Sequence, residues 1–255
     1  MTWTGPGNED DWIGFVPVGG SAGDVPGTAY AQVRDSDNNV LTVPVPSATG
    51  DYELVYILGH DTTVMARRAI AVTSVAATID APDEAYAGWM IDFSFSGPGA
   101  ATDWVAIVPA GADASTYLSA AWQGATEGGT ASVRVPAIPG AYEVRYVQEA
   151  ADDTTVLASR PLTVTEGPVS IDAPASVAAS ETFTVTAEGP LGPSDYIDFA
   201  QAGTEAGDYS LGWNYVDESG SSELTAPDAP GQYTLRYVVS VDGPHVIFEL
   251  PITVQ

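Results

Sequence analysis

The chain has 255 residues, of which 45% are apolar, enough for one large domain or about two to three small ones. It contains no cysteine, which excludes disulfides and thiolate metal sites. No apolar run approaches the ~20 residues of a membrane span, and the N-terminus lacks the basic and apolar pattern of a signal peptide. With 34 acidic and 7 basic residues the net charge is −27, so nucleic acid and anionic membranes are unfavourable partners.

A Gly-Pro turn, a run of acids and an aromatic-led strand open the chain at residues 5–17 (GPGNEDDWIGFVP). On its own this stretch suggests an acidic loop that holds a metal ion. The pattern returns, however, as GPGAATDWVAIVP and more loosely as GPLGPSDYIDFA, and the starting residues Gly5, Gly97 and Gly189 are 92 residues apart each time. A turn that recurs in this way is more typical of a repeated domain than of a catalytic or metal-binding loop.

A second motif closes each copy. It reads GDYELVY from Gly50, GAYEVRY from Gly140 and GQYTLRY from Gly231, and a strand-like run follows it in every copy. Apolar and polar residues alternate within a copy, as in residues 89–96 (WMIDFSFS), and no helical stripe is present. The sequence therefore predicts an all-β fold of three tandem immunoglobulin- or fibronectin-III-like β-sandwiches of about seven strands each. The predicted domains are residues 1–73, 74–165 and 166–255.

The first tyrosine of the closing motif has a predicted structural role. Tyr52, Tyr142 and Tyr233 each follow a tight turn and open a strand. This is the pattern of a tyrosine corner, in which the hydroxyl bonds to nearby backbone. We therefore assign these three residues to the structure of the fold.

The opening motif predicts which residues face the core. The apolar alternate positions of its strand are expected inside: Ile13, Phe15, Val105, Ile107, Ile197 and Phe199. The aromatic residue that begins the strand is then expected at its mouth, over the Gly-Pro loop. The aspartate before it (Asp11, Asp103 or Asp195) is expected to accept hydrogen bonds from the loop amides in an Asx-type turn, with a shared cation site as the alternative.

Together the patterns GPG…DW(I/V), PGxYE and the closing SRPLTVT resemble the β-sandwich repeats attached to von Willebrand A-type domains in bacterial envelope proteins. The D-W-(I/V) segment is also similar to the N-terminal sandwich of purple acid phosphatases and to SKICH domains. The resemblance covers all three copies and is best in the second. The first departs at Ala69, where the others have proline, and the third at Tyr196 and Asp198. The resemblance implies accessory spacer or interaction modules, because the chain has neither the D-x-S-x-S motif of a von Willebrand A domain nor a phosphatase metal cluster.

Calcium is the one cofactor that the sequence leaves open. Residues 35–39 (DSDNN) resemble the start of a calcium loop, but an EF-hand needs Gly and Glu where this chain has Val40 and Pro46. A hairpin turn is therefore predicted here and at the matching ATEGG (residues 125–129) and DESGS segments. Better calcium candidates lie where the second and third copies begin: Asp80, Asp83, Glu84 and Asp172.

No catalytic motif is recognisable, and the seven basic residues are all arginine, which excludes lysine-dependent chemistry. Aromatic residues offer a sugar-binding alternative, since Tyr30, Trp122 and Trp213 occupy matching positions. Leu211, Trp213 and Tyr215, however, share one apolar parity. A core location is therefore predicted for these rings rather than an open sugar-stacking face.

The first copy is incomplete in its sequence. About 23 residues precede the Gly-Pro turn in the second copy, but only four do so in the first. Aligned on that turn, Met1 and Trp3 match Phe93 and Phe95, so the whole first strand is expected to be absent. We expect Met1 to be an introduced start and the parent protein to extend upstream. We also expect an unpaired edge at residues 69–73 that is open to strand addition by a partner.

These observations favour a non-catalytic spacer or adhesion-type interaction segment of a bacterial envelope or secreted protein. The repeat type, rather than a signal sequence, places it outside the cytoplasm. The expected partner is a protein or a glycan, with neither nucleic-acid binding nor membrane insertion. A glycan-binding array and calcium-rigidified linker domains are the alternative hypotheses.

Overall fold

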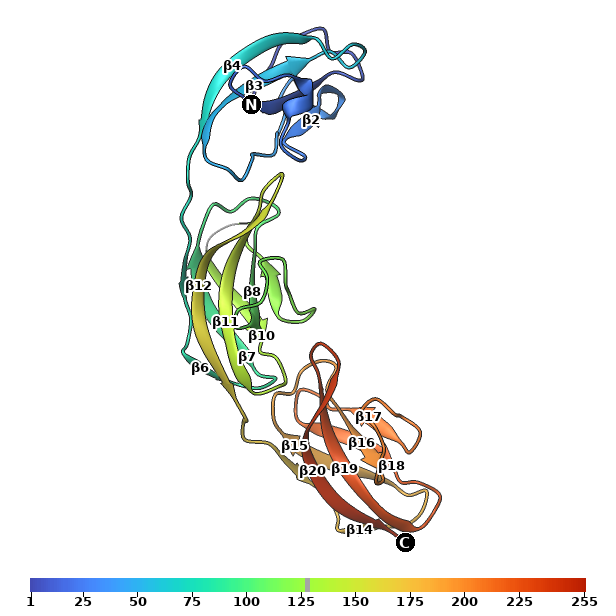
Figure 1. Cartoon of the computed structure of the whole chain (residues 1–255). Helices are drawn as coiled ribbons and strands as arrows, with labels where there is room; N and C mark the ends of the chain where they lie inside the picture. Colours follow the sequence, from blue (N-terminus) through green and yellow to red (C-terminus); the bar gives the residue numbers. More distant parts are fainter. Residues whose placement is uncertain (127–128) are drawn as a thin grey trace.

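The computed structural model describes residues 1–126 and 129–255, which form three β units in a row along a bent rod (Figure 1). The helical segments of this part of the chain are two single 3-10 turns, η1 (Ala22–Asp24) and η2 (Val33–Asp35). Neither is long and apolar enough to cross a membrane. No strand ladder within the described residues joins two units, so each unit forms its own sheets.

The second unit is a sandwich of two sheets, as predicted. The smaller sheet has the order β10-β7-β5 and the larger one β6-β12-β11-β8-β9. All neighbours are antiparallel except β6 and β12, and this arrangement is immunoglobulin-like. The strands are β5 (Thr78–Asp80), β6 (Glu84–Tyr86), β7 (Met90–Ser96), β8 (Trp104–Pro109), β9 (Trp122–Gly124), β10 (Gly129–Arg134), β11 (Gly140–Glu149) and β12 (Thr154–Thr165).

The third unit repeats this topology with sheets β13-β15-β18 and β14-β20-β19-β16-β17. Its strands are β13 (Ser170–Asp172), β14 (Ser176–Val177), β15 (Thr182–Glu188), β16 (Tyr196–Ala200), β17 (Trp213–Tyr215), β18 (Ser221–Thr225), β19 (Gly231–Ser240) and β20 (Pro244–Val254). Each of these units has eight strands rather than about seven, because its first strand is broken in two. In the second unit the break contains Pro82, which cannot donate to a ladder, and the chain crosses there from one sheet to the other.

The predicted core set is buried on the inner face of the larger sheet in each unit. Val105, Ile107, Ile197 and Phe199 are 0% exposed, and Ile13 and Phe15 are nearly as well covered. The alternate residues of the same strands lie on the outer face of the larger sheet. The period of two therefore predicted the correct inner face for all three copies of this strand.

The first unit contains the larger sheet with the order β2-β1-β3-β4. Its strands are β1 (Trp12–Pro17), β2 (Tyr30–Gln32), β3 (Gly50–Ile57) and β4 (Val64–Val72). In the described residues the smaller sheet is reduced to one bridge between Thr2 and Val40. Hydrogen bonds from the Trp3 N–H to Asn39 O (3.1 Å) and from the Leu41 N–H to Met1 O (2.9 Å) flank it. Within the described residues β4 pairs only with β3 and is therefore an edge strand of the larger sheet.

The turn predicted at residues 35–39 is a tight hairpin. Asp37 and Val40 exchange main-chain hydrogen bonds of 3.1 and 2.8 Å. Asn38 and Asn39 have φ angles of 50° and 61°, the left-handed values of a type I′ turn. The matching turn of the second unit includes residues 127 and 128, which lie outside the described residues.

A hairpin of the second unit reaches back to the first. In the β11–β12 connection the Ala151 N–H donates to Val45 O at 3.2 Å, and Ala151 O accepts from the Thr28 N–H at 2.9 Å. The Asp152 carboxylate accepts from the Ser47 N–H at 2.7 Å. These bonds supplement the covalent join between β4 and β5.

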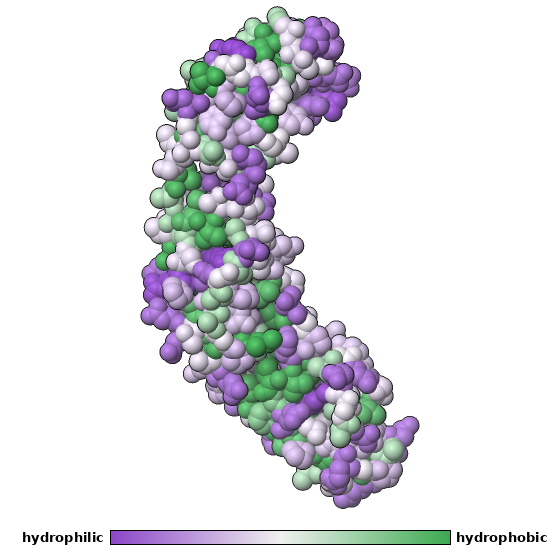
Figure 2. Space-filling model, in the orientation of Figure 1, coloured by the Kyte–Doolittle hydropathy of each residue, from purple (hydrophilic) through white to green (hydrophobic). Residues whose placement is uncertain are grey.

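A buried ion pair links the second and third units. Arg134 of β10 donates Nη2–H to Asp195 Oδ2 at 2.5 Å and Nε–H to Gly88 O at 2.8 Å. The two charged side chains are 8% and 0% exposed. Ala137 of the second unit is buried in the apolar core of the third. Figure 2 shows apolar residues (green) gathered at the join between the second and third units.

Candidate functional site

The aspartate of the opening motif is buried in a hydrogen-bond network. Asp11, Asp103 and Asp195 are 1%, 1% and 0% exposed. In the second unit Asp103 Oδ2 accepts from the Ala100 N–H of the Gly-Pro loop at 3.1 Å and from the Tyr146 hydroxyl at 2.7 Å. The matching loop amides of Asn8 and Gly192 donate to Asp11 and Asp195. In all three units the carboxylate thus satisfies loop main chain, as in an Asx-type turn.

A second tyrosine, which the sequence analysis did not single out, completes the network. Tyr56, Tyr146 and Tyr237 lie four residues after the corner tyrosines. Their hydroxyls donate to the aspartate at 2.7, 2.7 and 3.5 Å, and each accepts a loop N–H at 3.0 Å. The signal was present in the sequence, because a tyrosine recurs at this place in every copy.

These tyrosines also overturn one prediction about the Gly-Pro loop. The first glycine of the loop is Gly5, Gly97 or Gly189. A Cβ added to it would lie only 2.3 to 2.6 Å from the ring of Tyr56, Tyr146 or Tyr237, so these rings cover the loop. The aromatic residue that begins the strand does not cover it: Trp104 packs with Ala106 and Val108 on the outer face of the strand. The glycine is required because the ring of a different strand occupies the space.

In the first unit the contacts of the network lower the pKa of its aspartate and raise that of its tyrosine. Burial opposes ionisation of Asp11, but hydrogen bonds from Tyr56, Gly59 and Asn8 together lower the pKa of its carboxyl. Burial raises the pKa of Tyr56, the partner of Asp11, and raises the pKa of Tyr146 in the second unit to about 12. An ionised Asp11 beside a neutral Tyr56 holds the loop and does not exchange protons near neutral pH, so this network fits a structural role better than a catalytic one.

The corner tyrosines fasten the closing strands to the turns before them. The hydroxyls of Tyr52, Tyr142 and Tyr233 donate to a main-chain oxygen four residues earlier, at 3.2, 2.9 and 2.9 Å. The acceptors are Ala48, Ile138 and Ala229. This is the geometry of a tyrosine corner.

The outer face of the larger sheet carries a cluster of aromatic rings. In the second unit Trp104 of β8 packs against Tyr117, with ring centroids 6.2 Å apart, and Tyr117 contacts Trp122 of β9 at 6.0 Å. Trp104 is 7% exposed, whereas Tyr117 and Trp122 are 59% and 47% exposed. One ring is therefore covered, and the two outer rings are open to solvent.

The cluster recurs at the same place in the other units with different members. In the third unit Tyr196 contacts Tyr209 and Trp213 at 5.4 and 5.8 Å, and Trp213 contacts Tyr215 at 5.1 Å. In the first unit the pair is Trp12 and Tyr30, at 5.5 Å. The outer rings are exposed: Tyr30, Tyr209, Trp213 and Tyr215. β2 and β17 lie on the concave side of the bend in Figure 1.

The prediction that Tyr30, Trp122 and Trp213 lie in the core is therefore wrong, and strand register explains the error. Trp122 pairs with Ala106 of β8, and Tyr30 pairs with Gly14 of β1. Directly opposed residues of an antiparallel pair point to the same face, and this is the outer face. The parity of a three-residue strand shows which residues share a face but not which face is the core.

An arginine holds the loop that carries the exposed tyrosine. Arg145 of β11 donates to the main-chain oxygens of Ala112 and Asp113, in the loop that leads to Tyr117. In the third unit Arg236 donates to Thr204 O at 2.8 Å in the loop before Tyr209. Arg236 also makes a two-point ion pair with Asp198, at 2.9 and 2.6 Å, which accounts for the acid inside that strand.

The cluster of the second unit borders a pocket of about 330 Å³. Tyr117 and Trp122 form its apolar side, and Thr102 and Glu149 lie at its polar side. Glu149 is held in place, since its Oε1 accepts from Trp104 Nε1–H at 3.2 Å and its main-chain oxygen accepts from the Thr102 hydroxyl at 3.1 Å. Rings beside a fixed carboxylate can contact a sugar or a basic or aromatic side chain.

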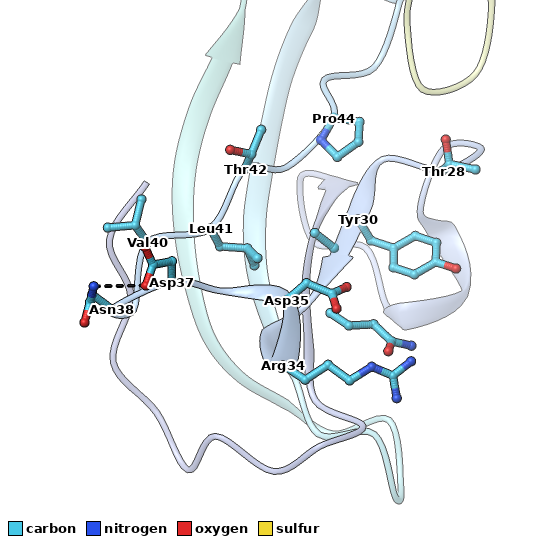
Figure 3. Close-up of a pocket in the computed structure, with 12 residues that line it drawn as sticks. Thr28, Tyr30, Arg34, Asp35, Asp37, Asn38, Val40, Leu41, Thr42 and Pro44 are labelled. Atoms are coloured by element: carbon cyan, nitrogen blue, oxygen red, sulfur yellow. Dashed lines mark hydrogen bonds between the residues drawn. The ribbon is translucent and has the colours of Figure 1, made fainter. Parts of the chain in front are cut away.

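A more open pocket of about 910 Å³ lies beside β2 in the first unit. In Figure 3 the Tyr30 and Arg34 side chains extend to the same side of this segment, while Asn38 turns away and donates to the Asp37 carboxylate at 2.9 Å. Arg34 makes no ion pair with any described residue. The pocket thus brings one aromatic ring and one cation to a common opening.

Two of the four calcium candidates, Asp80 and Asp83, lie beside a cation of the chain itself. The Arg160 guanidinium lies 2.9 Å from Asp83 and 3.7 Å from Asp80. Glu84 is an exposed residue of β6, and Asp172 is an exposed residue of β13, in a different unit. Within the described residues no group of three or more His, Cys, Asp or Glu side chains is placed to hold a metal ion.

No family model matches the chain, and no curated protein matches it in sequence. Several solved structures do match the chain. An adhesin of Yersinia pseudotuberculosis, InvE, is 15% identical with a TM-score of 0.27, and the match covers 71% of this chain and 58% of that one. Three immunoglobulin domains of titin are 10% identical over 97% of this chain and 88% of that one, with a TM-score of 0.26. The eight N-terminal immunoglobulin domains of the Down Syndrome Cell Adhesion Molecule are 14% identical over 96% and 36%, with a TM-score of 0.25.

The chain therefore spans 58% of the length of the adhesin structure that it matches. The assignment of immunoglobulin-like units rests on the strand order of this chain's own sheets. The von Willebrand A-associated repeat family, suggested by the sequence motifs, stays a hypothesis.

Proposed function

We propose that the chain is a non-catalytic spacer and adhesion-type interaction segment of a bacterial envelope or secreted protein, acting outside the cytoplasm. The observation that carries this proposal is the recurrence of an exposed aromatic cluster at the same place in three joined units. Tyrosine and tryptophan are enriched in interfaces, and exposed rings grouped in one place typically mark an interaction surface. A rod that repeats such a surface can engage a partner at several points.

Charge narrows the chemistry of the partner. The net charge of −27 disfavours anionic partners and favours neutral or basic ones. Aromatic rings beside a fixed carboxylate, as at Trp122 and Glu149, suit an arginine- or lysine-bearing protein surface. We therefore place a basic or neutral surface protein first among the partners.

The test is binding of the full chain to an array of extracellular proteins, compared with a triple variant. Tyr30→Ala, Trp122→Ala and Trp213→Ala remove one exposed ring from each unit. Tyr86→Ala serves as the matched control, because Tyr86 is 49% exposed but lies on β6, away from the clusters. The proposal predicts signals that the triple variant loses and the control keeps. Equal binding by all three proteins would contradict it.

A glycan-binding array is the second candidate function, favoured by the 330 Å³ pocket of the second unit. Sugar rings stack on exposed tryptophan, and Thr102 and Glu149 supply hydrogen-bonding groups beside it. A glycan array separates the two candidates. Signals lost with Trp122→Ala alone would establish sugar binding there, whereas an empty glycan array would remove this candidate and leave protein recognition.

A further inference from the structure

The pocket of the second unit is small, and its aromatic walls are held in place. Its volume of about 330 Å³ lies at the lower end of the range of small-molecule sites, so it suits one side chain or one sugar ring. The ring planes of Tyr117 and Trp122 meet at 65°, so the two walls differ in orientation. Arg145 holds the loop that leads to Tyr117, and Trp122 is paired with Ala106 of β8. Little ordering is therefore needed before a ligand binds.

The exposure of these rings is a feature of the repeat. The second unit has both of its sheets, and the third unit follows this complete sandwich. The matching rings of the third unit, Tyr209, Trp213 and Tyr215, are nevertheless exposed. A preceding unit therefore leaves the outer face of the next unit open to a ligand.

Two acids border the pocket without a cation among the described residues. Glu149 Oε1 accepts from Trp104 Nε1–H at 3.2 Å, and its Oε2 makes no hydrogen bond with any described residue. Asp103 also lines the pocket, and its Oδ1 is buried with no partner in the described part of the chain. The three arginines of this unit are paired with other acids. The pocket therefore has negative charge that an incoming cation can neutralise.

This pair of acids distinguishes the second unit from the other two. The position of Glu149, three residues after the network tyrosine, is occupied by Gly59 in the first unit and by Ser240 in the third. There the main-chain amide donates to Oδ1 of the buried aspartate, at 3.1 and 3.3 Å. In the second unit Asp103 lacks this bond, and Glu149 adds a second carboxylate. Stability of the fold does not require this change, because the other two units form without it.

The hydrogen-bonding groups of the pocket favour a cation over a sugar. The free carboxylate oxygens of Asp103 and Glu149 accept hydrogen bonds, and the Thr102 hydroxyl already donates to Glu149 O at 3.1 Å. A guanidinium has five N–H donors and no acceptor, and its plane stacks on aromatic rings. A sugar hydroxyl is a donor and an acceptor and carries no charge. The acids and the rings together therefore match an arginine side chain.

We propose that this pocket is an arginine-recognition site, in which a guanidinium of a partner protein stacks on Trp122 and Tyr117 and donates to the Glu149 carboxylate. This assignment rests on the proposed function and deepens it, because it names the side chain that the partner presents to the second unit. The net charge of −27 favours the approach of a basic partner, more strongly at low salt. Tryptophan, tyrosine and arginine are also the residues that contribute most to binding energy in protein interfaces.

The probe is a capped tripeptide with arginine between two glycines, titrated into the full chain and followed by NMR at the Trp122 indole N–H. Two matched peptides carry lysine or citrulline, the neutral isostere of arginine, at the centre. The arginine peptide is expected to bind about fivefold more tightly than either, and less tightly as salt is added. Equal binding of the citrulline peptide, or signals that shift only away from Trp122 and Tyr117, would overturn the proposal.

Two glutamate variants test the ion pair. Glu149→Gln keeps an oxygen that accepts from Trp104 Nε1–H and removes the charge, so it is expected to weaken arginine binding about fivefold. Glu84→Gln is the matched control, because it changes the net charge equally in the same unit but lies on β6, at the opposite edge of the larger sheet. It is expected to bind within about twofold of the native chain. Equal losses in the two variants would mean that net charge alone attracts the peptide, and would overturn the site.

A protein partner from the array distinguishes this site from the proposed function. Binding that is lost with Trp122→Ala and also with Glu149→Gln would support both. A partner that needs Trp122 but not Glu149 would overturn the arginine site and leave the adhesion function standing. Arginine-peptide binding at Trp122 with no partner on the array would support the site and count against the adhesion function. A glycan that binds through Trp122, with no binding of the arginine peptide, would assign the pocket to a sugar and overturn the proposal.

Discussion

Replacing Tyr146 with phenylalanine tests whether the aspartate–tyrosine network, in addition to the apolar core, holds each unit together. The change keeps the ring and removes one hydroxyl. It deletes the hydrogen bond to Asp103 (2.7 Å) and the acceptor of the Gly99 N–H (3.0 Å). Among the described residues Asp103 then keeps one hydrogen bond: its Oδ1 is buried and has no partner there, and its Oδ2 accepts from the Ala100 N–H.

The magnitude follows from these contacts. A hydrogen bond to a charged group contributes about 1.5–3 kcal/mol and a neutral one about 0.5–1.5 kcal/mol, so Tyr146→Phe is expected to cost about 2–4 kcal/mol. Tyr56→Phe should cost about 2 kcal/mol, because Asp11 keeps its bonds from Gly59 and Asn8.

Tyr237→Phe is expected to cost least, about 1 kcal/mol. Its hydroxyl lies 3.5 Å from Asp195, and that carboxylate is also paired with Arg134. The same substitution at three copies of one position therefore serves as its own control. The predicted order of destabilisation is second unit, first unit, third unit.

Native-state hydrogen exchange is the appropriate assay, because three units in one chain need not unfold together. Protection of the amides in β11, β3 and β19 reports the free energy of opening of each unit. Each substitution is expected to lower protection in its own unit by the amounts given. Equal losses in the three units, or the largest loss with Tyr237→Phe, would refute the reasoning from hydrogen-bond satisfaction.

Three further predictions concern the joins, pH and calcium. Arg134→Met leaves Asp195 buried without its cation, so it should cost about 3 kcal/mol or more and broaden the range of shapes in small-angle scattering; an unchanged profile would contradict a fixed join. Burial opposes ionisation of Glu143, but hydrogen bonds from Arg145, Ser159 and Gly111 lower its pKa from 4.5 to about 2. Because the folded-state pKa of Glu143 lies below its unfolded value, the stabilisation by the ionised carboxylate is complete above about pH 5 and is lost as the pH falls towards 2. The difference in the free energy of unfolding between the native chain and Glu143→Gln, measured in urea, should therefore shrink over that pH range. Millimolar calcium should raise the melting temperature no more than sodium of equal ionic strength, since Arg160 already neutralises Asp80 and Asp83; a larger rise would contradict this expectation and support calcium-rigidified domains.

The tandem β architecture was predictable because its signals are local or strictly periodic. Alternation over six or seven residues identifies a strand and its faces, and a spacing of 92 residues identifies the repeat. The inner position of Ile13 and its counterparts followed from parity over a long strand. The extra strand could also have been anticipated, since Ala81-Pro82 and Ala173-Pro174 interrupt the first strand in the second and third copies.

The candidate site was not predictable by the same means. Trp122 and Trp213 lie on three-residue strands, where parity cannot distinguish the core face from the outer face. The contacts that decide this join residues far apart in the sequence, such as Ala106 with Trp122 and Asp198 with Arg236. Register and ion pairing of this kind are set by the tertiary fold.

In each unit an arginine anchors the loop that precedes the aromatic strand β2, β9 or β17. Arg145 and Arg236 hold the loops that bear Tyr117 and Tyr209. In the first unit, Arg67 of the neighbouring strand supplies the guanidinium instead and donates to Gly20 O at 2.7 Å. This anchored loop, residues 18–29, contains no aromatic residue.

The arginine-to-loop hydrogen bond is therefore present even where the loop carries no exposed ring, so it serves the fold. The further exposed rings are found in the second and third units. Their clusters contain three and four rings, against two in the first unit. If the clusters bind the partner, Trp122→Ala and Trp213→Ala must each weaken binding more than Tyr30→Ala does, because each opens a larger contact surface. Single-variant titrations against a partner found on the array measure this order. Equal losses for the three variants would mean that the units contribute alike and that the added rings do not determine recognition.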